Sequence, residues 1–254
     1  MKIILTATPQ QGALLAARIF IAQLQRQPAS VLGLATGSTP IPLYRELVQA
    51  HVRGVLSFSR VQCFNLDEYV GLPPEHPQSY QYFMRAHLFK HVDIPATNYH
   101  LPDGMAPNLA MEVQAYERAI VAAGGIDMQL LGIGQNGHIG FNEPGCALDG
   151  RTHVEDLTQQ TINDNARLFF NNDIAAVPKR ALTMGVGTIM DARQCVLLAF
   201  GHNKAKVIAG MLEGPITNNN PASILQKHPN VHVIVDAAAA ALIQKRTLIT
   251  TEPS

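Results

Sequence analysis

Residues 128–145 read MQLLGIGQNGHIGFNEPG, a short apolar run followed by a loop rich in glycine that also holds a histidine and a glutamate. The apolar run, Met128–Ile133, has the length and composition of a buried strand. Strands without polar alternation are typical of parallel sheets that are covered on both faces. The stretch therefore predicts a buried parallel strand that ends in a loop able to carry chemistry.

Similar apolar runs alternate with longer amphipathic segments along the rest of the chain. We expect strands at Lys2–Ala7, Val31–Leu34, Val61–Asn65, Met128–Ile133, Cys195–Phe200 and Val231–Val235. We expect helices at Gly12–Arg26, Pro42–His51, Ser79–Phe89, Asn108–Ala123, Asn203–Met211 and Ala222–Lys227. This alternation predicts an α/β fold with one open, mainly parallel, Rossmann-like sheet and helices on both faces. No linker or repeat interrupts the pattern, so we expect a single domain over residues 1–254.

The composition argues against several classes of protein. The 254 residues are 47% hydrophobic and 15% charged, and 19 basic side chains balance 19 acidic ones. A surface that binds nucleic acid normally has an excess of Lys and Arg, so we expect no such partner. The apolar runs are too short for a membrane span or a signal peptide. Three widely spaced cysteines, Cys63, Cys146 and Cys195, favour a reducing cytoplasm over a disulfide framework.

The residues after the second and third strands suggest an anion site and an acid–base group. The turn 36–39 reads TGST and precedes a helix, where exposed backbone N–H groups can hold a phosphate. An ordinary capped turn is the alternative. Asp67 and Glu68 follow the next strand and could supply a catalytic carboxylate with its partner. A helix cap or turn pair is the alternative for these two residues.

In the glycine-rich loop, His138 and Glu143 lie five residues apart. A carboxylate near an imidazole fixes its tautomer and raises its basicity, as a general acid–base requires. The same pair could bind a metal, but no third ligand has a suitable spacing, so we expect no metal. Gly132, Gly134 and Gly137 match a dinucleotide-binding pattern, but the apolar helix that the pattern needs does not follow. A nicotinamide-dependent dehydrogenase is therefore a weak alternative.

Two isolated cations complete the pattern. Lys204 opens a predicted helix, where the macrodipole disfavours a cation, so an anionic ligand is a good reason for its presence. Arg167 suits two-pronged phosphate binding. A solvated surface side chain is the alternative for each. Taken together, the strand ends predict a phosphorylated small substrate and proton-transfer chemistry.

Six segments carry a resemblance to a known family: LATGSTP (34–40), FNLDEY (64–69), GIGQNGHIGFNEP (132–144), NARLFF (165–170), LTMGVGT (182–188) and GHNKA (201–205). From about Lys2 to Ile243, the chain resembles the glucosamine-6-phosphate deaminases. Their superfamily also contains 6-phosphogluconolactonases and the sugar-phosphate-binding domains of transcription regulators.

The resemblance implies an enzyme of amino-sugar (N-acetylglucosamine) catabolism that converts glucosamine 6-phosphate and water to fructose 6-phosphate and ammonia without a cofactor. It implies that His138 opens the sugar ring, supported by Asn136 and Glu143. Asp67 would then move a proton from C2 toward C1. The residues implied for the phosphate are Gly37, Ser38, Thr39, Arg167 and Lys204.

The chain also departs from the family pattern. Some members have Asp in place of Asn136, so we expect Asn136 only to orient by hydrogen bonding, with Glu143 as the sole carboxylate partner of His138. Members activated by N-acetylglucosamine 6-phosphate carry basic residues where this chain has Glu155 and Asp156, which would repel a phosphate. We therefore expect weak or absent activation. Residues 153–182 resemble the mobile lid of the family, and the oligomeric state, monomer or homo-oligomer, stays open.

Two rival functions share the same scaffold. A 6-phosphogluconolactonase needs a histidine that activates water but no base at C2, so Asp67 discriminates against this function. A sugar-phosphate sensor would bind without turnover and usually carries a DNA-binding helix-turn-helix, for which the sequence has neither spare length nor a basic face.

Overall fold

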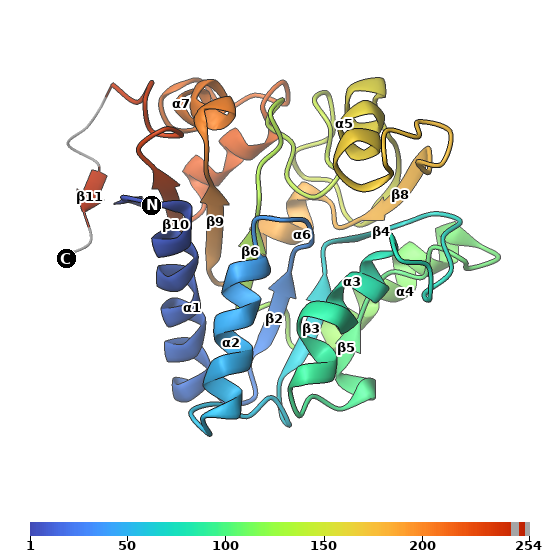
Figure 1. Ribbon diagram of the computed structural model, residues 1–254. Helices are drawn as coiled ribbons and strands as arrows, with labels where there is room; N and C mark the ends of the chain where they lie inside the picture. The colour runs from blue at the N-terminus through green and yellow to red at the C-terminus, as the bar shows by residue number, and fades with distance from the viewer. Residues whose placement is uncertain (245–248, 252–254) are drawn as a thin grey trace.

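The protein is described by a computed structural model that covers residues 1–244 and 249–251. Eight strands form a parallel sheet in the order β11-β1-β10-β9-β6-β2-β3-β5 (Figure 1). Their bounds are β1 Lys2–Thr6, β2 Val31–Leu34, β3 Gln62–Asn65, β5 Tyr99–His100, β6 Met128–Leu131, β9 Cys195–Ala199, β10 Val231–Asp236 and β11 Ile249–Thr251. Most of the C-terminal tail from Gln244 lies outside the described residues. In the described part of the chain, no helix is both long and apolar enough to cross a membrane.

Helices cover both faces of this sheet, because the chain crosses it first in one direction and then in the other. From β1 through β2 and β3 to β5, right-handed crossovers place α1, α2 and α3 on one face. The return through β6 places α4 and α6 on the opposite face (Figure 1). The bounds are α1 Pro9–Arg26, α2 Ile41–Val52, α3 Tyr80–His87, α4 Leu109–Ala122, α6 Val186–Met190 and α7 Ala205–Glu213. The predicted parallel α/β architecture is confirmed.

Local sequence signals set the starts of three helices. The side chains of Thr8, Ser79 and Asn108 accept hydrogen bonds from backbone N–H groups three residues further on, as N-cap residues do. The six predicted strands are present with ends shifted by at most two residues. β2, β6 and β9 are buried along their whole length, which agrees with sequences that are apolar apart from Gln129 in β6.

Two predicted helices differ in the structure. Residues 221–227 form a 3₁₀ helix (η4, Pro221–Lys227) and not the predicted α-helix. The N–H of His228 donates to the carbonyl of Leu225 at 3.1 Å, with the three-residue spacing of a 3₁₀ helix. The N–H of Ala222, in the first turn where a helix offers no partner, donates to the carbonyl of Gly137 at 3.0 Å. The helix predicted at Asn203–Met211 begins with a separate 3₁₀ turn (η3, His202–Lys204), and α7 follows it. Short 3₁₀ turns also occupy Phe89–His91 (η1) and Ala96–Asn98 (η2).

A second, smaller sheet stands beside the carboxyl ends of the main strands and was not predicted. It is antiparallel, in the order β4-β8-β7, with β4 at Asp67–Tyr69, β7 at His153–Asp156 and β8 at Arg180–Thr183. Helix α5 (Gln159–Phe169) connects β7 to β8. These elements surround a core of their own, which contains Tyr69, Phe141, Ile162 and Phe170. Residues 153–183, called the 153–183 segment below, include the whole of the expected lid at 153–182.

The two sheets meet at one residue. Leu66 alone separates β3 from β4, and its carbonyl accepts a hydrogen bond from the N–H of Met184 at 2.7 Å, directly after β8. Asp67 is therefore the first residue of the small sheet and also follows directly on the end of a strand in the main sheet.

Candidate active site

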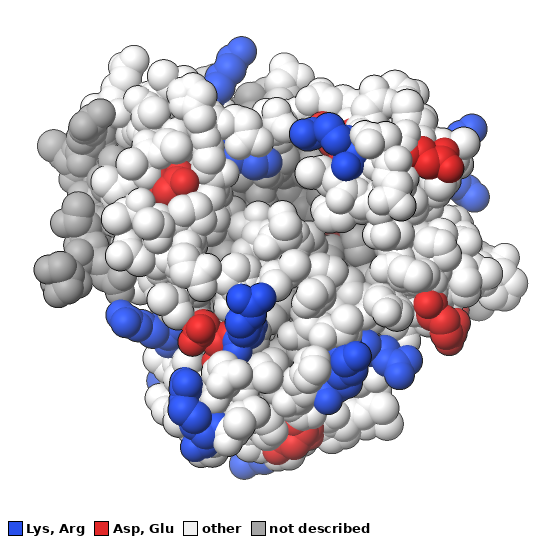
Figure 2. All heavy atoms as spheres, in the orientation of Figure 1, with Lys and Arg blue, Asp and Glu red and all other residues white. Residues whose placement is uncertain are grey.

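A cavity of about 490 Å³ opens at the carboxyl ends of β2, β3, β6 and β9. The chain reverses its direction across the sheet between the neighbouring strands β2 and β6, which is where α/β sheets typically bind ligands. The surface facing the viewer is hollowed there, with Lys and Arg side chains beside the hollow (Figure 2). The 153–183 segment closes one side of the cavity through α5.

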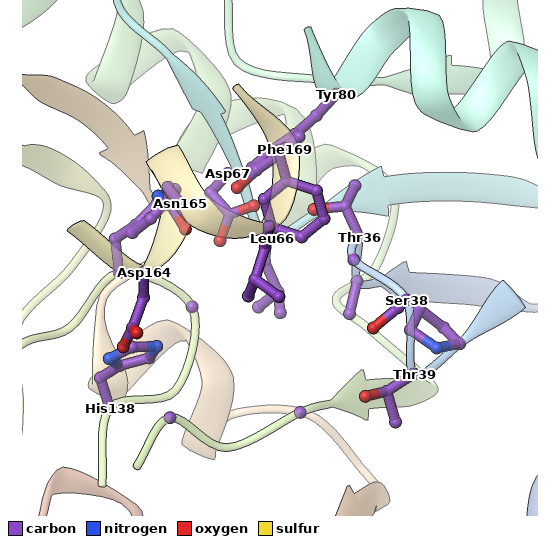
Figure 3. Close-up of a pocket in the computed structure, with 18 of the residues that line it drawn as sticks. Thr36, Ser38, Thr39, Leu66, Asp67, Tyr80, His138, Asp164, Asn165 and Phe169 are labelled. Atoms are coloured by element: carbon purple, nitrogen blue, oxygen red, sulfur yellow. The ribbon is translucent and has the colours of Figure 1, made fainter. Parts of the chain in front are cut away.

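Seven of the nine predicted site residues line this cavity. They are Gly37, Ser38, Thr39, Asp67, His138, Arg167 and Lys204. The other two, Asn136 and Glu143, lie behind His138. Figure 3 shows Ser38 and Thr39 on one side of the pocket and His138 on the other, with Asp67 between them. Segments that are far apart in the sequence are thus brought together in one cavity.

The predicted anion turn has an open backbone next to the start of α2. Gly37 has a φ of +96°, a conformation that glycine adopts without strain. A Cβ at this position would meet no atom within 4 Å, so the turn is open on this side. The hydroxyl groups of Ser38 and Thr39 and the first N–H groups of α2 can supply hydrogen bonds to a phosphate here.

The ring of His138 packs on one side and faces a carboxylate on the other. A Cβ at Gly134 would overlap the imidazole, so the absence of a side chain there lets the ring lie against the backbone. His138 Nδ1 is buried and lies 3.7 Å from Glu143 Oε2, longer than a hydrogen bond. Such contacts are often long in an unliganded site and shorten when substrate binds.

Glu143 is buried, with an exposed fraction of 2%, and both of its oxygens have partners. Asn136 Nδ2 donates to Oε2 at 2.7 Å, while the Thr158 hydroxyl donates to Oε1 at 3.3 Å and the Thr161 hydroxyl makes a shorter bond to the same oxygen. Burial alone would raise the pKa of Glu143. The His138 ring and the donated hydrogen bonds outweigh burial and lower the pKa to about 2. Glu143 is therefore anionic at neutral pH.

Asp67 has the opposite electrostatic environment. Burial raises its pKa to about 8, and the negative charge of Glu68 adds to this effect. Glu68 itself is anchored by three backbone N–H groups, those of Tyr69, Tyr80 and Gln81, each at 2.9 Å. It thereby fastens the start of α3 to β4. A carboxylate with a raised pKa is a stronger base than a solvated one, which suits proton abstraction.

The two cations hold different positions. Lys204 is half-buried, and its Nζ donates to the carbonyl of Ile133 at 2.6 Å. Burial lowers the pKa of Lys204, and the charge of Asp164 partly opposes this shift. The Arg167 side chain is 60% exposed and its Nη2 lies 3.3 Å from Asp164 Oδ1. Both cations line the cavity, so both can reach a bound anion there.

Sequence reasoning missed the cavity residues that α5 contributes besides Arg167. Thr161, Asp164, Asn165 and Leu168 line the cavity, with the i, i+3, i+4, i+7 spacing of one helix face. Asn165 Nδ2 donates to Tyr69 Oη at 2.7 Å, which ties α5 to the small sheet. The pattern Thr158-x-x-Thr161 was the available signal, since Thr158 is the N-cap of α5.

The same geometry bears on a metal site and on a dinucleotide site. In the described residues, no group of three or more His, Cys, Asp or Glu side chains is close enough to hold a metal ion. The glycine pattern at 132–137 leads into turns and an isolated bridge between Ile139 and Asn142, whereas a dinucleotide site needs a helix there.

Comparisons with known proteins agree with this picture. The family model described as glucosamine-6-phosphate isomerases/6-phosphogluconolactonase matches residues 7–234. A glucosamine-6-phosphate deaminase of Hahella chejuensis is 51% identical over 244 residues, 96% of this chain and 92% of that protein. One of Thermoanaerobacter pseudethanolicus is 48% identical over 248 residues, 98% and 97% of the two chains.

Solved structures show the same likeness. A monomeric glucosamine-6-phosphate deaminase superimposes with a TM-score of 0.92 at 43% identity, covering 95% of this chain and 100% of the other. A 6-phosphogluconolactonase of Trypanosoma brucei, 23% identical, shares the fold with a TM-score of 0.77 over 94% of this chain and 97% of its own. With a family model that spans most of its length and relatives near 50% identity, the chain belongs to the glucosamine-6-phosphate isomerase/6-phosphogluconolactonase family.

Proposed function

We propose that this protein is a glucosamine-6-phosphate deaminase, which converts glucosamine 6-phosphate and water to fructose 6-phosphate and ammonia. The observation that carries the proposal is the placement of Asp67, a buried carboxylate with a raised pKa, in one cavity with His138 and an anion-binding turn. Relatives with this name at about half identity support the same substrate.

The phosphate is held by the turn 37–39, with Lys204 and Arg167 as counter-charges. This group lies far from the carbon atoms that react. Its binding energy can therefore fix the open sugar chain in a reactive geometry without stabilising the ground state at the reacting bonds.

Ring opening is the task of His138. The imidazole takes the proton of the C1 hydroxyl and returns a proton to the ring oxygen as the C1–O5 bond breaks. A histidine can donate and accept protons near neutral pH. Glu143, kept anionic by its hydrogen bonds, faces Nδ1 and can orient the ring. Asn136 holds Glu143 in this orientation.

Asp67 then acts on the open chain. Its carboxylate removes the proton at C2 while a proton of the substrate's ammonium group passes to O1, which gives an enolamine with a C1–C2 double bond. Asp67 then returns the C2 proton to C1, and the product is an iminium ion at C2. Water adds to this carbon, and the C–N bond breaks to release ammonia and leave the ketone of fructose 6-phosphate. The raised pKa of Asp67 makes the carboxylate basic enough to remove a C–H proton.

Two rival functions would use this cavity differently. A 6-phosphogluconolactonase activates water at an ester carbon and has no need for a base at C2. The buried Asp67 therefore favours the deaminase function. A sugar-phosphate sensor has no need for the His138–Glu143 pair or for a buried carboxylate of raised pKa.

We further propose a cytoplasmic enzyme of one domain that needs neither metal nor organic cofactor. The three cysteines are free, and Cys63 and Cys195 are buried in strands of the main sheet. Unpaired thiols of this kind suit a reducing compartment. We propose that the enzyme is a monomer or a homo-oligomer. The relative that superimposes with a TM-score of 0.92 is described as monomeric.

A coupled assay tests the proposal. Purified protein is mixed with glucosamine 6-phosphate, and fructose 6-phosphate and ammonia are both followed. We expect equal release of the two products and a loss of kcat of roughly 10²–10⁴-fold in Asp67→Asn, because a general base is removed. Asp156→Asn, an exposed carboxylate that does not line the cavity, is the matched control and should keep full activity.

Three results would contradict the proposal. Hydrolysis of 6-phosphogluconolactone without deamination would assign the chain to the lactonases. Tight binding of glucosamine 6-phosphate without product would indicate a sensor. Unchanged activity in Asp67→Asn would show that Asp67 is not the general base.

A further inference from the structure

The Glu143 carboxylate contacts two parts of the molecule at once. Its Oε2 faces the His138 loop, where Asn136 Nδ2 donates to it at 2.7 Å and His138 Nδ1 lies at 3.7 Å. Its Oε1 accepts hydrogen bonds from Thr158 and Thr161, at the start of α5 in the 153–183 segment. One carboxylate thus binds the segment on one side and orients the imidazole on the other.

The same helix carries cavity residues for the opposite end of the substrate. Arg167, the exposed phosphate cation, lies less than two turns after Thr161 on α5. Asn165 on this helix is tied to Tyr69 of the small sheet. The position of α5 therefore affects the phosphate cation and the partner of His138 together.

Of the two threonines, Thr161 is the more buried, with an exposed fraction of 5%, and its hydroxyl donates to Glu143 Oε1. Thr158 has another task, since its Oγ1 accepts the N–H of Thr161 at 3.3 Å as the N-cap of α5. Its single hydroxyl proton is also shared between Glu143 Oε1 at 3.3 Å and Thr161 Oγ1 at 3.1 Å.

We propose that Thr161 is a positioning residue that couples the placement of the 153–183 segment to the orientation of Glu143, and through Glu143 to His138. This inference rests on the deaminase function proposed above for the chemistry of His138. With Thr161 in place, Glu143 is held with Oε2 toward the imidazole. Displacement of α5 withdraws both hydroxyl donors and leaves Oε1 of a buried carboxylate without them, so Glu143 in turn stabilises α5 where it stands.

Three single variants separate this role from a general effect on folding. Thr161→Val replaces the hydroxyl by a methyl of similar size, and Thr161→Ser keeps the hydroxyl. Gln159→Ala removes an exposed side chain of the same helix whose bond, 2.9 Å to Asn163, does not involve Glu143. We expect kcat to fall roughly tenfold to 100-fold in Thr161→Val with little change in KM, because Glu143 and His138 lose their alignment. Thr161→Ser should recover most of kcat, and Gln159→Ala should match the wild type.

A double-mutant cycle tests whether Thr161 acts through Glu143. If it does, Thr161→Val has little further effect on kcat in the Glu143→Gln background, so the two losses are not additive. Additive losses, or equal losses in Thr161→Val and Thr161→Ser, would mean that Thr161 only packs the helix, and the proposal would be withdrawn.

A second measurement uses no substrate, so it holds even if the deaminase assay fails. Amide hydrogen exchange over residues 159–169 reports how firmly α5 is held. We expect exchange to rise roughly tenfold in Glu143→Gln and in Thr161→Val, and no further in the double variant, because a charge-assisted hydrogen bond is lost. Unchanged exchange of α5 in Glu143→Gln would show that Glu143 does not hold the segment, and would overturn the inference whatever the enzyme does.

Discussion

At the scale of single residues, Asp67 is buried at a position that disfavours the ionised form of its carboxyl group. Burial and the charge of Glu68 raise its pKa from 3.8 in an unfolded chain to about 8 in the folded one. Between these two values, the unfolded chain has lost the proton that the folded chain keeps. Unfolding therefore releases a proton in this range, and a rise in pH favours the unfolded state. The carboxylate proposed as the catalytic base thus lowers the stability of the fold from about pH 4 upward.

Asp67→Asn should make the folded protein more stable while it abolishes activity. The variant removes the cost just described, so we expect Tm to rise by several degrees at pH 8, about 2–4 °C for each kcal/mol recovered in a chain of this size. The gain should shrink as the pH is lowered toward 4. Thermal unfolding across this pH range checks the prediction, with Asp156→Asn as the control. A Tm at pH 8 that is equal to or below that of the wild type would contradict it.

Asn136 differs from Asp in what it offers to its neighbours. Its Nδ2 donates to Glu143 at 2.7 Å, and its Oδ1 accepts the backbone N–H of His138 at 3.2 Å. An aspartate here would lose the donor and bring a second negative charge against Glu143. A like charge disfavours the ionised form, so the pKa of Glu143 would rise from its low value.

Asn136→Asp should therefore shift the pH dependence of the enzyme. Because Glu143 must be ionised to support His138, we expect the acidic limb of the kcat profile to move to higher pH in the variant. Rates measured between pH 5 and pH 9 provide the test, and Asn163→Asp, an exposed position on α5, is the control. An unaltered profile in Asn136→Asp would show that the residue does not act through Glu143.

At the scale of elements, the two basic side chains at the start of β7, Arg151 and His153, already have carboxylate partners. Arg151 donates to Glu117 at 2.8 Å and to Asp191 at 2.6 Å, and His153 Nε2 lies 2.9 Å from Glu155 Oε2. In family members that respond to N-acetylglucosamine 6-phosphate, this region is expected to hold the effector phosphate. Here a phosphate would have to displace carboxylates from both Arg151 and His153.

We therefore expect N-acetylglucosamine 6-phosphate not to activate this enzyme. The curve of rate against glucosamine 6-phosphate should be hyperbolic, and saturating effector should change KM by less than the roughly fivefold that allosteric coupling usually produces. Initial rates with and without the effector are sufficient. A sigmoidal curve that becomes hyperbolic on addition of the effector would contradict this expectation.

Six strands of the main sheet were predictable, whereas β5, β11 and the strands of the small sheet were not. The strands β2, β6 and β9 are fully buried, so their sequences are apolar apart from Gln129 in β6. β7 is only half buried and reads His-Val-Glu-Asp, which shows no clear period. β4 reads Asp-Glu-Tyr, and all three residues are buried, including the two acidic ones. A hydrophobic pattern cannot reveal such a strand. Tertiary contacts, and not local propensity, make these strands.

At the scale of the whole molecule, the division into a main sheet and a small sheet explains how much of the site could be predicted. Turns at strand ends converge because a parallel sheet puts all its carboxyl ends on one edge, so Gly37, Asp67 and His138 could be placed together from the sequence. The contributions of α5 depend on how the 153–183 segment folds back over that edge. Thr161 and Asp164 could therefore not be assigned to the cavity before the small sheet was known.

The junction at Leu66 leaves little freedom to the backbone of the proposed base. Leu66 is the one residue between β3 and β4, and its carbonyl accepts the N–H of Met184 at 2.7 Å. Asp67, the next residue, pairs with Thr183 of β8. Its backbone is therefore held by both sheets at once, whereas Arg167, the proposed phosphate cation, has a side chain that is 60% exposed on α5. Rigid support of this kind keeps a reacting group in a fixed geometry.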